Sequence, residues 1–559
     1  MKPSACLLCA LLLLPAAISP AGDIILNWNT YLREALKRDS EHSNPGYATR
    51  AMAMMNGAMY DARQAIKRTH QPFHVDLTVA PTTNMTAACS EAAFRLAKEL
   101  YPAELSYLNW ANGYTLSLQP AGAAKDAGIA LGDSVAAAYI AWRAGDGSAA
   151  TVPYTPSSAP GKWRPDPLFF PTQTAWGPEW GAVQPFALTS STQFAPPPPP
   201  ALTSAQYTAA WNEVRQLGAR NSATRTADQT QIGNFWAYDR SGLGPPPVMF
   251  NLHLHEIATQ RGNSETQNAR LFAMASVAMA DAVVAGWQAK FTYSYWRPVT
   301  GIREADTDGN AATAAQPAWE PLGCPGGGIF PDFTPPFPSY VSGHASMGEA
   351  AFEVLKYFYG TDNVTYSLTS AELPGVTRSY TRLSQAAQEN ADSRVYLGVH
   401  WRFDQTEGQT LGRNVADYVV AHQFMPLVET FADFCNIHGL TGVATDDADH
   451  DGCTDFAEYA FNTHPRVMDQ PPAARKEIIG GQTCIAIHYS RRPARMTAGL
   501  QLNAQISSDL QSWEETGFED EPDPAATQTA EVEFRRAWLP LTGSGKLFMR
   551  LWSQVPQGQ

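Results

Sequence analysis

Apolar residues recur at three- and four-residue spacing along most of the chain up to about residue 424, which is the period of amphipathic helices. In the first third, this pattern predicts helical structure over residues 28–68, 86–100, 103–113 and 121–144. Methionines such as Met52 and Met59 recur within it and are interpreted as core packing, because methionine fills irregular gaps. The first third is therefore expected to be a helical bundle.

Residues 145–200 have a different character, rich in Trp, Pro and Gly, and end in five consecutive prolines, 196–200. This composition predicts a connector with little regular structure that closes on a stiff polyproline spacer. Helical periodicity then resumes and predicts a second bundle, with helices at 203–217, 225–238, 248–261, 263–291, 345–359, 384–391 and 405–424.

Beyond about residue 427 the helical pattern stops, and after about residue 477 the alternation typical of strands begins. Four such runs, 484–492, 500–507, 530–539 and 546–552, predict a small β module. The expected fold class is mainly α, with two helical bundles, a short calcium-loop segment and this β module. The expected divisions are 1–21, 22–200, 201–426, 427–470 and 471–559.

Composition limits the kinds of partner. The 559 residues are 44% hydrophobic and 16% charged, as in ordinary globular proteins, and the formal net charge is -14 with a pI near 5.3. Such a charge disfavours nonspecific binding to nucleic acid or to an anionic membrane. Any anion site must therefore be built from local cations.

The N-terminus has the layout of a secretory signal: Lys2, an apolar run over 5–17, and small residues at 19–21. Residues 1–21 are expected to be a signal peptide, and the mature protein is expected to be exported to the periplasm or the extracellular space. The sequence after this segment has no run of about 18 uninterrupted apolar residues, so membrane insertion is not expected. Removal of the leader leaves five widely spaced cysteines, enough for at most two disulfides: Cys89, Cys324, Cys435, Cys453 and Cys484.

The segment 338–344, Pro-Ser-Tyr-Val-Ser-Gly-His, leads directly into the apolar helix predicted at 345–359. Ser342 and Gly343 would place a hydroxyl and an approachable amide at the positive end of the helix dipole, which suits an anion. His344 beside them would exchange a proton. The alternative is a capping serine, a turn glycine and a surface histidine.

Neighbouring segments add cations and a second histidine. Lys290 precedes Arg297 by seven residues, two turns of a helix, so both are expected on one side and in one pocket. Arg394 supplies a third cation, and Asp404 follows His400 at the spacing of one helical turn, where it would orient the imidazole. Three cations, a Ser-Gly turn and two histidines suit a tetrahedral or trigonal-bipyramidal oxyanion.

Taken in order, Lys-x6-Arg-Pro, Pro-Ser-x-x-Ser-Gly-His and Ser-Arg-x5-His-x3-Asp resemble the signature shared by vanadium-dependent haloperoxidases and type 2 phosphatidic-acid-phosphatase-like acid phosphatases. The resemblance implies a haloperoxidase-like helical core with vanadate as cofactor. It implies that His344 is the acid-base group and that His400 bonds to vanadium. The oxyanion-binding set that it implies is Lys290, Arg297, Ser342, Gly343, Arg394 and His400.

Flanking aromatic residues favour the bacterial, chloroperoxidase-like branch of that family. Trp287, Phe337 and the segment 235–239 resemble the walls of its halide and peroxide site, with Asp239 expected beside Arg394; core packing is the alternative interpretation. The resemblance then implies oxidation of halide by hydrogen peroxide to hypohalous acid for an organic acceptor. In that reaction, Lys290 would donate a hydrogen bond to an oxygen of the bound peroxide.

Two other functions stay open at this stage. One is a phosphomonoesterase that forms a phosphohistidine at His400, with His344 protonating the leaving oxygen. The other is a noncatalytic calcium-binding surface protein. The sequence also leaves the oligomeric state open, a homodimer included.

The calcium prediction rests on an acidic loop with the ligand spacing of an EF-hand and a glycine at its sixth position. A solvated acidic loop is the alternative. The expected ligands are Asp447, Asp449, Asp451, Cys453 through its backbone, Asp455 and Glu458.

Overall fold

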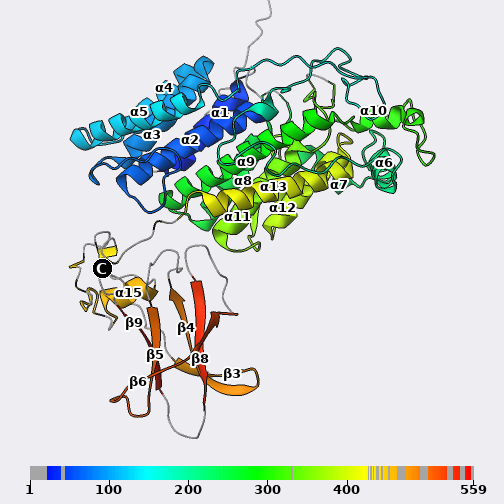
Figure 1. Ribbon diagram of the computed structural model, residues 1–559. Helices are drawn as coiled ribbons and strands as arrows, with labels where there is room; N and C mark the ends of the chain where they lie inside the picture. Colours follow the sequence, from blue (N-terminus) through cyan, green and yellow to red (C-terminus); the bar gives the residue numbers. More distant parts are fainter. Residues whose placement is uncertain are drawn as a thin grey trace, which may run out of the picture.

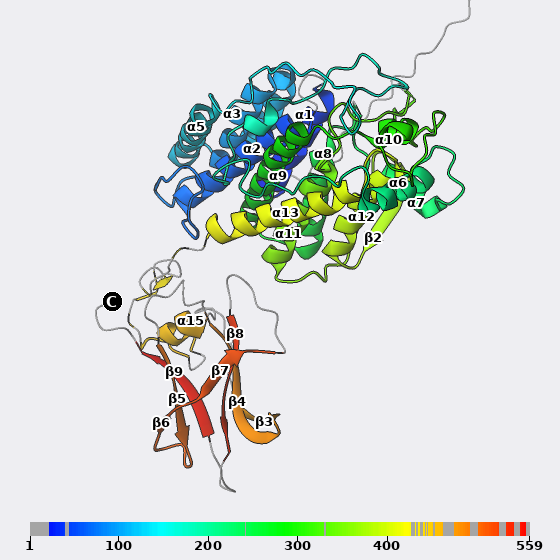
Figure 2. The ribbon, with the colours of Figure 1, turned by 45° about the vertical axis from the view of Figure 1, so that its right-hand side comes forward.

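The structure is a computed structural model, and it consists of a helical body followed by a β module that lies apart from it in both views (Figures 1 and 2). It describes residues 22–39, 44–240, 242–328, 331–425, 427, 431, 434–435, 440–441, 443, 445–450, 453–461, 474–491, 501–524, 533–541 and 548–554. The predicted signal peptide, residues 1–21, lies outside the described residues.

The first half of the helical body contains five helices that agree with the predicted bundle. Side-chain caps fix several of their starts: Asp23 accepts from the first turn of the first helix, and Asn44 accepts from Tyr47 in the second. The bounds are α1 Ile24–Arg38, α2 Pro45–Ile66, α3 Met85–Leu100, α4 Leu105–Ser117 and α5 Ala123–Arg143, with the 3-10 turn η1 Pro102–Glu104.

Over its described residues, the second half adds eight helices, of which α9 lies at the centre. These are α6 Ala205–Leu217, α7 Ala227–Phe235, α8 Pro246–Arg261, α9 Glu265–Tyr293, α10 Pro298–Arg303, α11 Gly343–Tyr359, α12 Leu383–Tyr396 and α13 Arg402–His422, with 3-10 turns η2 Trp180–Ala182 and η3 Ala305–Thr307.

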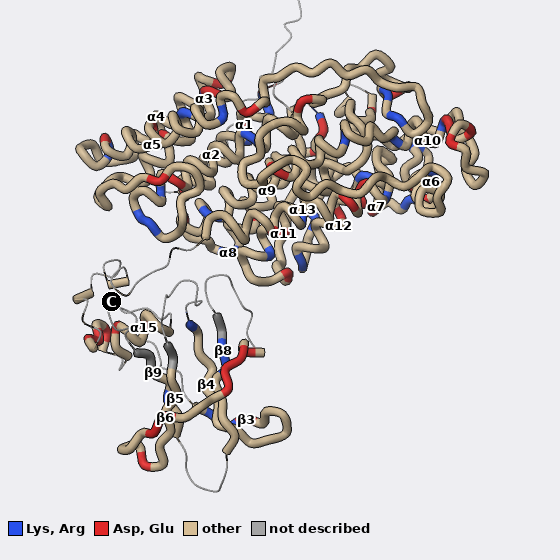
Figure 3. The backbone as a smooth tube through the Cα atoms, viewed as in Figure 1, with Lys and Arg blue, Asp and Glu red and all other residues tan. Residues whose placement is uncertain are grey.

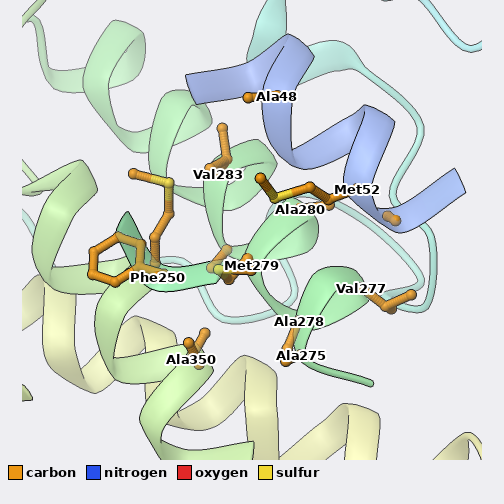
Figure 4. Packing of buried hydrophobic residues seen from close by; sticks show 14 of the residues in the cluster. Ala48, Met52, Phe250, Ala275, Val277, Ala278, Met279, Ala280, Val283 and Ala350 are labelled. Atoms are coloured by element: carbon orange, nitrogen blue, oxygen red, sulfur yellow. The ribbon is translucent and has the colours of Figure 1, made fainter. Parts of the chain in front are cut away.

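Helix α9 is the centre of the packing. It contacts α2 of the first half and α11 and α13 of the second, and the α2–α9 contact is made by alanines, valines and methionines such as Met52 and Met279 (Figure 4). It is long and apolar enough to cross a membrane, yet its apolar window is wholly buried inside the protein, as in a core helix. One hydrophobic core therefore runs through both halves, while the domain boundaries stay predictions.

The connector is held against the helical body. Phenol groups donate hydrogen bonds to carbonyls of the proline run, from Tyr293 to Pro196 over 2.9 Å and from Tyr340 to Pro197 over 2.6 Å. Upstream, the buried carboxylate of Asp281 on α9 accepts the backbone N–H groups of residues 186–188. The predicted spacer is thus a strap on the surface of the bundle.

Five strands and the short helix α10 were not predicted. A hairpin of β1 Tyr366–Thr369 and β2 Thr377–Tyr380 lies between α11 and α12, and its four-residue strands are too short to give a clear alternation. In the β module, β3, β6 and β7 join the four predicted strands.

The β module has two antiparallel sheets, ordered β3-β4-β8-β7 and β6-β5-β9. A small core including Phe461, Ile487 and Met549 lies between them, and the short helix α15 packs on β4 and β9. The bounds are α15 Asp455–Phe461, β3 Ala474–Ile479, β4 Gln482–Arg491, β5 Gln501–Ser507, β6 Glu514–Thr516, β7 Glu519–Pro522, β8 Glu533–Pro540 and β9 Phe548–Gln554.

Candidate active site

The Ser-Gly-His turn forms the N-terminus of α11. Ser342 is the N-cap, where its hydroxyl accepts from the amide of Ala345 over 3.4 Å, so the helix begins at Gly343, two residues earlier than predicted. A side chain at Gly343 would lie 3.2 Å from the ring of Trp287, closer than ordinary contact. Glycine therefore lets the turn pack directly on the indole.

Lys290 and Arg297 converge, but the two-turn helical geometry expected for them is wrong. Helix α9 ends at Tyr293 because Ser294 adopts a left-handed conformation, with φ 49°. Arg297 is extended, with φ -82° and ψ 158°, as is usual for a residue before proline. Both cations instead meet over the ring of Phe337, each 5.0 Å from its centroid.

The ammonium group of Lys290 holds the turn together. It donates to the carbonyls of Pro338, Ser339 and Val341, over 2.9, 3.0 and 2.5 Å. An ammonium has three N–H groups, so these contacts account for all of them. Burial, followed by repulsion from Arg297, lowers the pKa of Lys290 well below its usual value. Donation to a bound peroxide stays a prediction, and it requires Lys290 to release one carbonyl.

Two buried guanidinium groups at the site keep N–H groups that no described residue accepts from. Arg297 and Arg394 are each 1% exposed. Among the described residues, Nη2 of Arg297 and both Nε and Nη1 of Arg394 have no hydrogen-bond partner. Unsatisfied charged donors are costly inside a protein. The arrangement is that of a pocket completed by an anion.

Asp239 organises the far side of Arg394. Its carboxylate accepts from Nη2 of Arg394 over 2.6 Å, the pairing expected from the sequence, and lies 4.0 Å from Nε2 of His344. Burial alone would raise the pKa of Asp239, but the charge of Arg394, followed by that of His344, outweighs burial and lowers it below its usual value. The thiol of Cys324, which sequence reasoning missed, contacts both Asp239 and Arg394, over 3.1 and 3.2 Å.

His400 is oriented by a carboxylate. Its Nδ1 lies 2.9 Å from Oδ2 of Asp404, which also accepts from the hydroxyl of Ser339 and from the amide of Trp401. His400 precedes α13, so a turn rather than a helix brings the pair together. Since Nδ1 donates to the carboxylate, Nε2 is left with a lone pair, which here accepts from Nη1 of Arg297 over 2.9 Å.

The pKa of His400 lies well below its usual value because of burial, followed by the charges of Arg297 and Lys290. The imidazole is therefore neutral and keeps a lone pair for a metal. Burial raises the pKa of Asp404 to about 6, although the Ser339 hydroxyl and the Trp401 amide oppose the shift. Ser339 belongs to the Pro-Ser-x-x-Ser-Gly-His motif, but the spacing of that motif does not reveal that the Ser339 hydroxyl donates to Asp404.

Aromatic rings enclose this pocket on one side. Trp287 lies 5.1 Å from Phe337, and Trp176 of the connector packs edge-on against Trp287 at 5.2 Å, measured between ring centroids. Trp287 and the backbone turn thus exclude water from the cations, which strengthens their interaction with an anion.

The predicted calcium loop lies beside α15, where acidic residues gather (Figure 3). Asp455 and Glu458 are buried, while Asp451 lies outside the described residues. Over the part of the loop that the structure describes, no three His, Cys, Asp or Glu side chains form a metal-binding group. Calcium binding stays a prediction.

Three cysteines, Cys89, Cys324 and Cys484, are unpaired thiols.

Known proteins are similar to the helical body in sequence and in fold. The family model described as VCPO second helical-bundle domain matches residues 270–427, which contain all three segments of the signature. Vanadium chloroperoxidase from Curvularia inaequalis is 34% identical over 281 residues, 41% of this chain and 46% of that protein. Residues 270–427 are therefore similar to the second helical-bundle domain of vanadium chloroperoxidases.

Solved structures of vanadium haloperoxidases have the same fold. A bacterial vanadium-dependent iodoperoxidase superposes with a TM-score of 0.60 and 28% identity, covering 73% of this chain and 97% of its own. The holo form of a bacterial vanadium-dependent chloroperoxidase, 16% identical with a TM-score of 0.55, shares the fold over 69% of this chain and 94% of its own. The chain spans under half the length of the curated vanadium chloroperoxidase that it matches.

Proposed function

We propose that this protein is a vanadate-dependent haloperoxidase that uses hydrogen peroxide to oxidise a halide to hypohalous acid. The observation that carries the proposal is a set of buried N–H groups on Arg297 and Arg394 that have no partner within the described part of the chain and lie beside the lone pair of a neutral His400. An oxyanion with a metal at its centre satisfies both features, because it accepts from the guanidinium groups and takes a nitrogen ligand.

Vanadate fits the residues present. Arg297, Arg394, Ser342 and the amide of Gly343 would hold its oxygens, and Nε2 of His400 would be its protein ligand. When bound, vanadate supplies a Lewis-acidic metal at its highest oxidation state, which activates hydrogen peroxide toward halide. Arg297 must then exchange its hydrogen bond to His400 for one to the oxyanion.

His344 is the proton-exchanging group of the proposed mechanism. Its Nε2 donates to the carbonyl of Ala237 over 2.9 Å, which leaves Nδ1 unprotonated in the neutral ring. Burial, followed by the charge of Arg394, lowers the pKa of His344 to about 4. At neutral pH, Nδ1 is therefore a base that takes up a proton when hydrogen peroxide enters and returns it later.

The function is tested by two assays on one preparation. Halogenation of a phenol dye is measured with vanadate, peroxide and halide, and hydrolysis of an aryl phosphate is measured without vanadate. We expect vanadate- and peroxide-dependent halogenation. Phosphatase activity without halogenation would instead establish the phosphohistidine enzyme, and inactivity in both assays would leave the noncatalytic alternative.

The titration of His344 gives a second expected result. Without a bound anion, His344 titrates near pH 4, and added orthovanadate raises its pKa because a nearby negative charge favours the imidazolium. Since the folded pKa lies below the unfolded one, its contribution to stability is present above about pH 6.5 and is lost as the pH falls through about 4. Imidazole NMR measures the shift, and His344→Gln assigns the signal; a pKa unchanged by vanadate would contradict it.

We further propose that the acidic loop before α15 binds a structural calcium ion. Burial, together with repulsion from Asp446, Asp447 and Asp449, raises the pKa of Asp455, and a cation relieves that repulsion. At saturating calcium, we expect the β module to gain about 2–3 kcal/mol of unfolding free energy. Calorimetry with EDTA followed by calcium re-addition measures this gain, and Asp449→Asn should remove it; an EDTA-insensitive wild type would contradict it.

We also propose export of the chain after cleavage of residues 1–21, which N-terminal sequencing of the secreted protein tests. We propose that the hypohalous acid formed from the halide reacts with an organic acceptor. Light scattering tests whether the protein is a homodimer.

A further inference from the structure

Cys324 has no role in the proposed mechanism, yet its thiol contacts both members of the ion pair between Arg394 and Asp239. It is 0% exposed. Its sulfur lies 3.1 Å from Oδ2 of Asp239, to which the S–H donates, and accepts from Nη2 of Arg394 over 3.2 Å. The same Nη2 donates to Asp239 over 2.6 Å, so the three groups close a triangle.

The backbone around Cys324 is fixed on both sides. Its amide and carbonyl both pair with Phe333, over 2.8 and 3.0 Å, and Gly323 donates to the carbonyl of Leu397 at the end of α12. The side chain packs in a small cluster with Ala237, Leu397 and Val399. The thiol is therefore presented rigidly to the helix that carries Arg394.

We infer that Cys324 is a positioning residue for Arg394, and that it directs the Nε and Nη1 edge of the guanidinium toward the oxyanion. Arg394 has one nitrogen, Nη2, that is fully used by Asp239 and Cys324, and two that have no partner among the described residues. Nη2 of this planar guanidinium makes hydrogen bonds to two groups, Asp239 and Cys324. The second hydrogen bond restricts rotation of the guanidinium about the hydrogen bond to Asp239. The unused edge is thereby pre-organised for binding.

A thiol suits this position for a chemical reason. Burial raises the pKa of Cys324 well above its usual value, so it stays protonated and adds no charge. It can then donate to Asp239 without weakening the attraction between Asp239 and Arg394. A serine hydroxyl would keep both the donor and the acceptor, whereas alanine or valine would keep neither.

The inference rests on the proposed function, and vanadate affinity tests it without an activity assay. Equilibrium dialysis with orthovanadate is performed on the full chain carrying Cys324→Ala or Cys324→Ser. We expect Cys324→Ala to weaken the affinity by about three- to tenfold at unchanged thermal stability, as for one hydrogen bond. Cys324→Ser should stay within about twofold of wild type.

The matched control is Cys89→Ala, another fully buried thiol, which donates to the carbonyl of Met59 far from the pocket and should leave the affinity unchanged. If Cys324→Ala does not fold, Cys324→Val takes its place, because it fills the volume without a donor. Wild-type affinity in Cys324→Ala, or equal weakening in the alanine and serine variants, would overturn the positioning role. Absence of vanadate binding by the wild type would instead overturn the proposed function.

Discussion

His400→Ala is expected to abolish peroxide-dependent halogenation, a loss of about 10³-fold or more in kcat/KM, because the variant removes the nitrogen ligand itself. The neighbours of His400 stay satisfied, since Asp404 keeps the donors Ser339 and Trp401 and Arg297 keeps the carbonyl of Val399. The fold should therefore survive, and circular dichroism and steady-state kinetics measure both parts of the expectation.

His422→Ala is the control for that variant. His422 is exposed in the last turn of α13, outside the pocket, so its removal should leave kcat/KM unchanged. Halogenation that persists in His400→Ala would show that this nitrogen does not carry the reaction. Parallel loss in both variants would point to a general effect on the fold.

Lys290→Met is expected to destabilise the protein as well as to inactivate it. Methionine has a similar shape, but it leaves the carbonyls of Pro338, Ser339 and Val341 without their donor, at about 1–3 kcal/mol for each buried acceptor. The relief of burying an ammonium offsets part of this cost. We expect a net loss of about 2–5 kcal/mol in urea unfolding and at least a tenfold weaker affinity for vanadate.

A suitable control for Lys290→Met is Lys356→Met, because Lys356 is a partly exposed residue of α11 paired only with Glu353 among the described residues. It should change stability by less than about 0.5 kcal/mol. If Lys290→Met keeps wild-type stability but loses vanadate, Lys290 acts on the anion directly, as the resemblance implies, and its role as support for the turn is wrong.

Local sequence patterns predicted the parts of the site that form within one segment. Ser342, Gly343 and His344 occupy a helix N-terminus, which the apolar period of the following helix revealed. The interpretation failed where the chain leaves a helix: the apolar pattern predicted that the helix ends at residue 291, close to its observed end at Tyr293, yet the spacing from Lys290 to Arg297 was treated as two helical turns. Pro298, however, already restricts Arg297 to an extended backbone.

Contacts between distant segments could not be derived from spacing. The pairing of Asp239 with Arg394 was expected from the resemblance alone, and Cys324 lies in a Gly- and Pro-rich loop whose letters give no indication of where it folds back. The same limit applies to the strap, which was read as a spacer. Its carbonyls are bound by tyrosines more than 90 residues later in the chain.

Helix α9 has a consequence for how the protein would lose its proposed activity. It carries Lys290 near one end and packs along its length on α2 of the first half and on α11 and α13 of the second. Helix α9 cannot move away from the pocket without exposing core that it shares with α2, so heat or denaturant should act on both halves in one cooperative transition. Binding of vanadate would then raise the melting temperature of the entire helical body, including helices that never touch the anion.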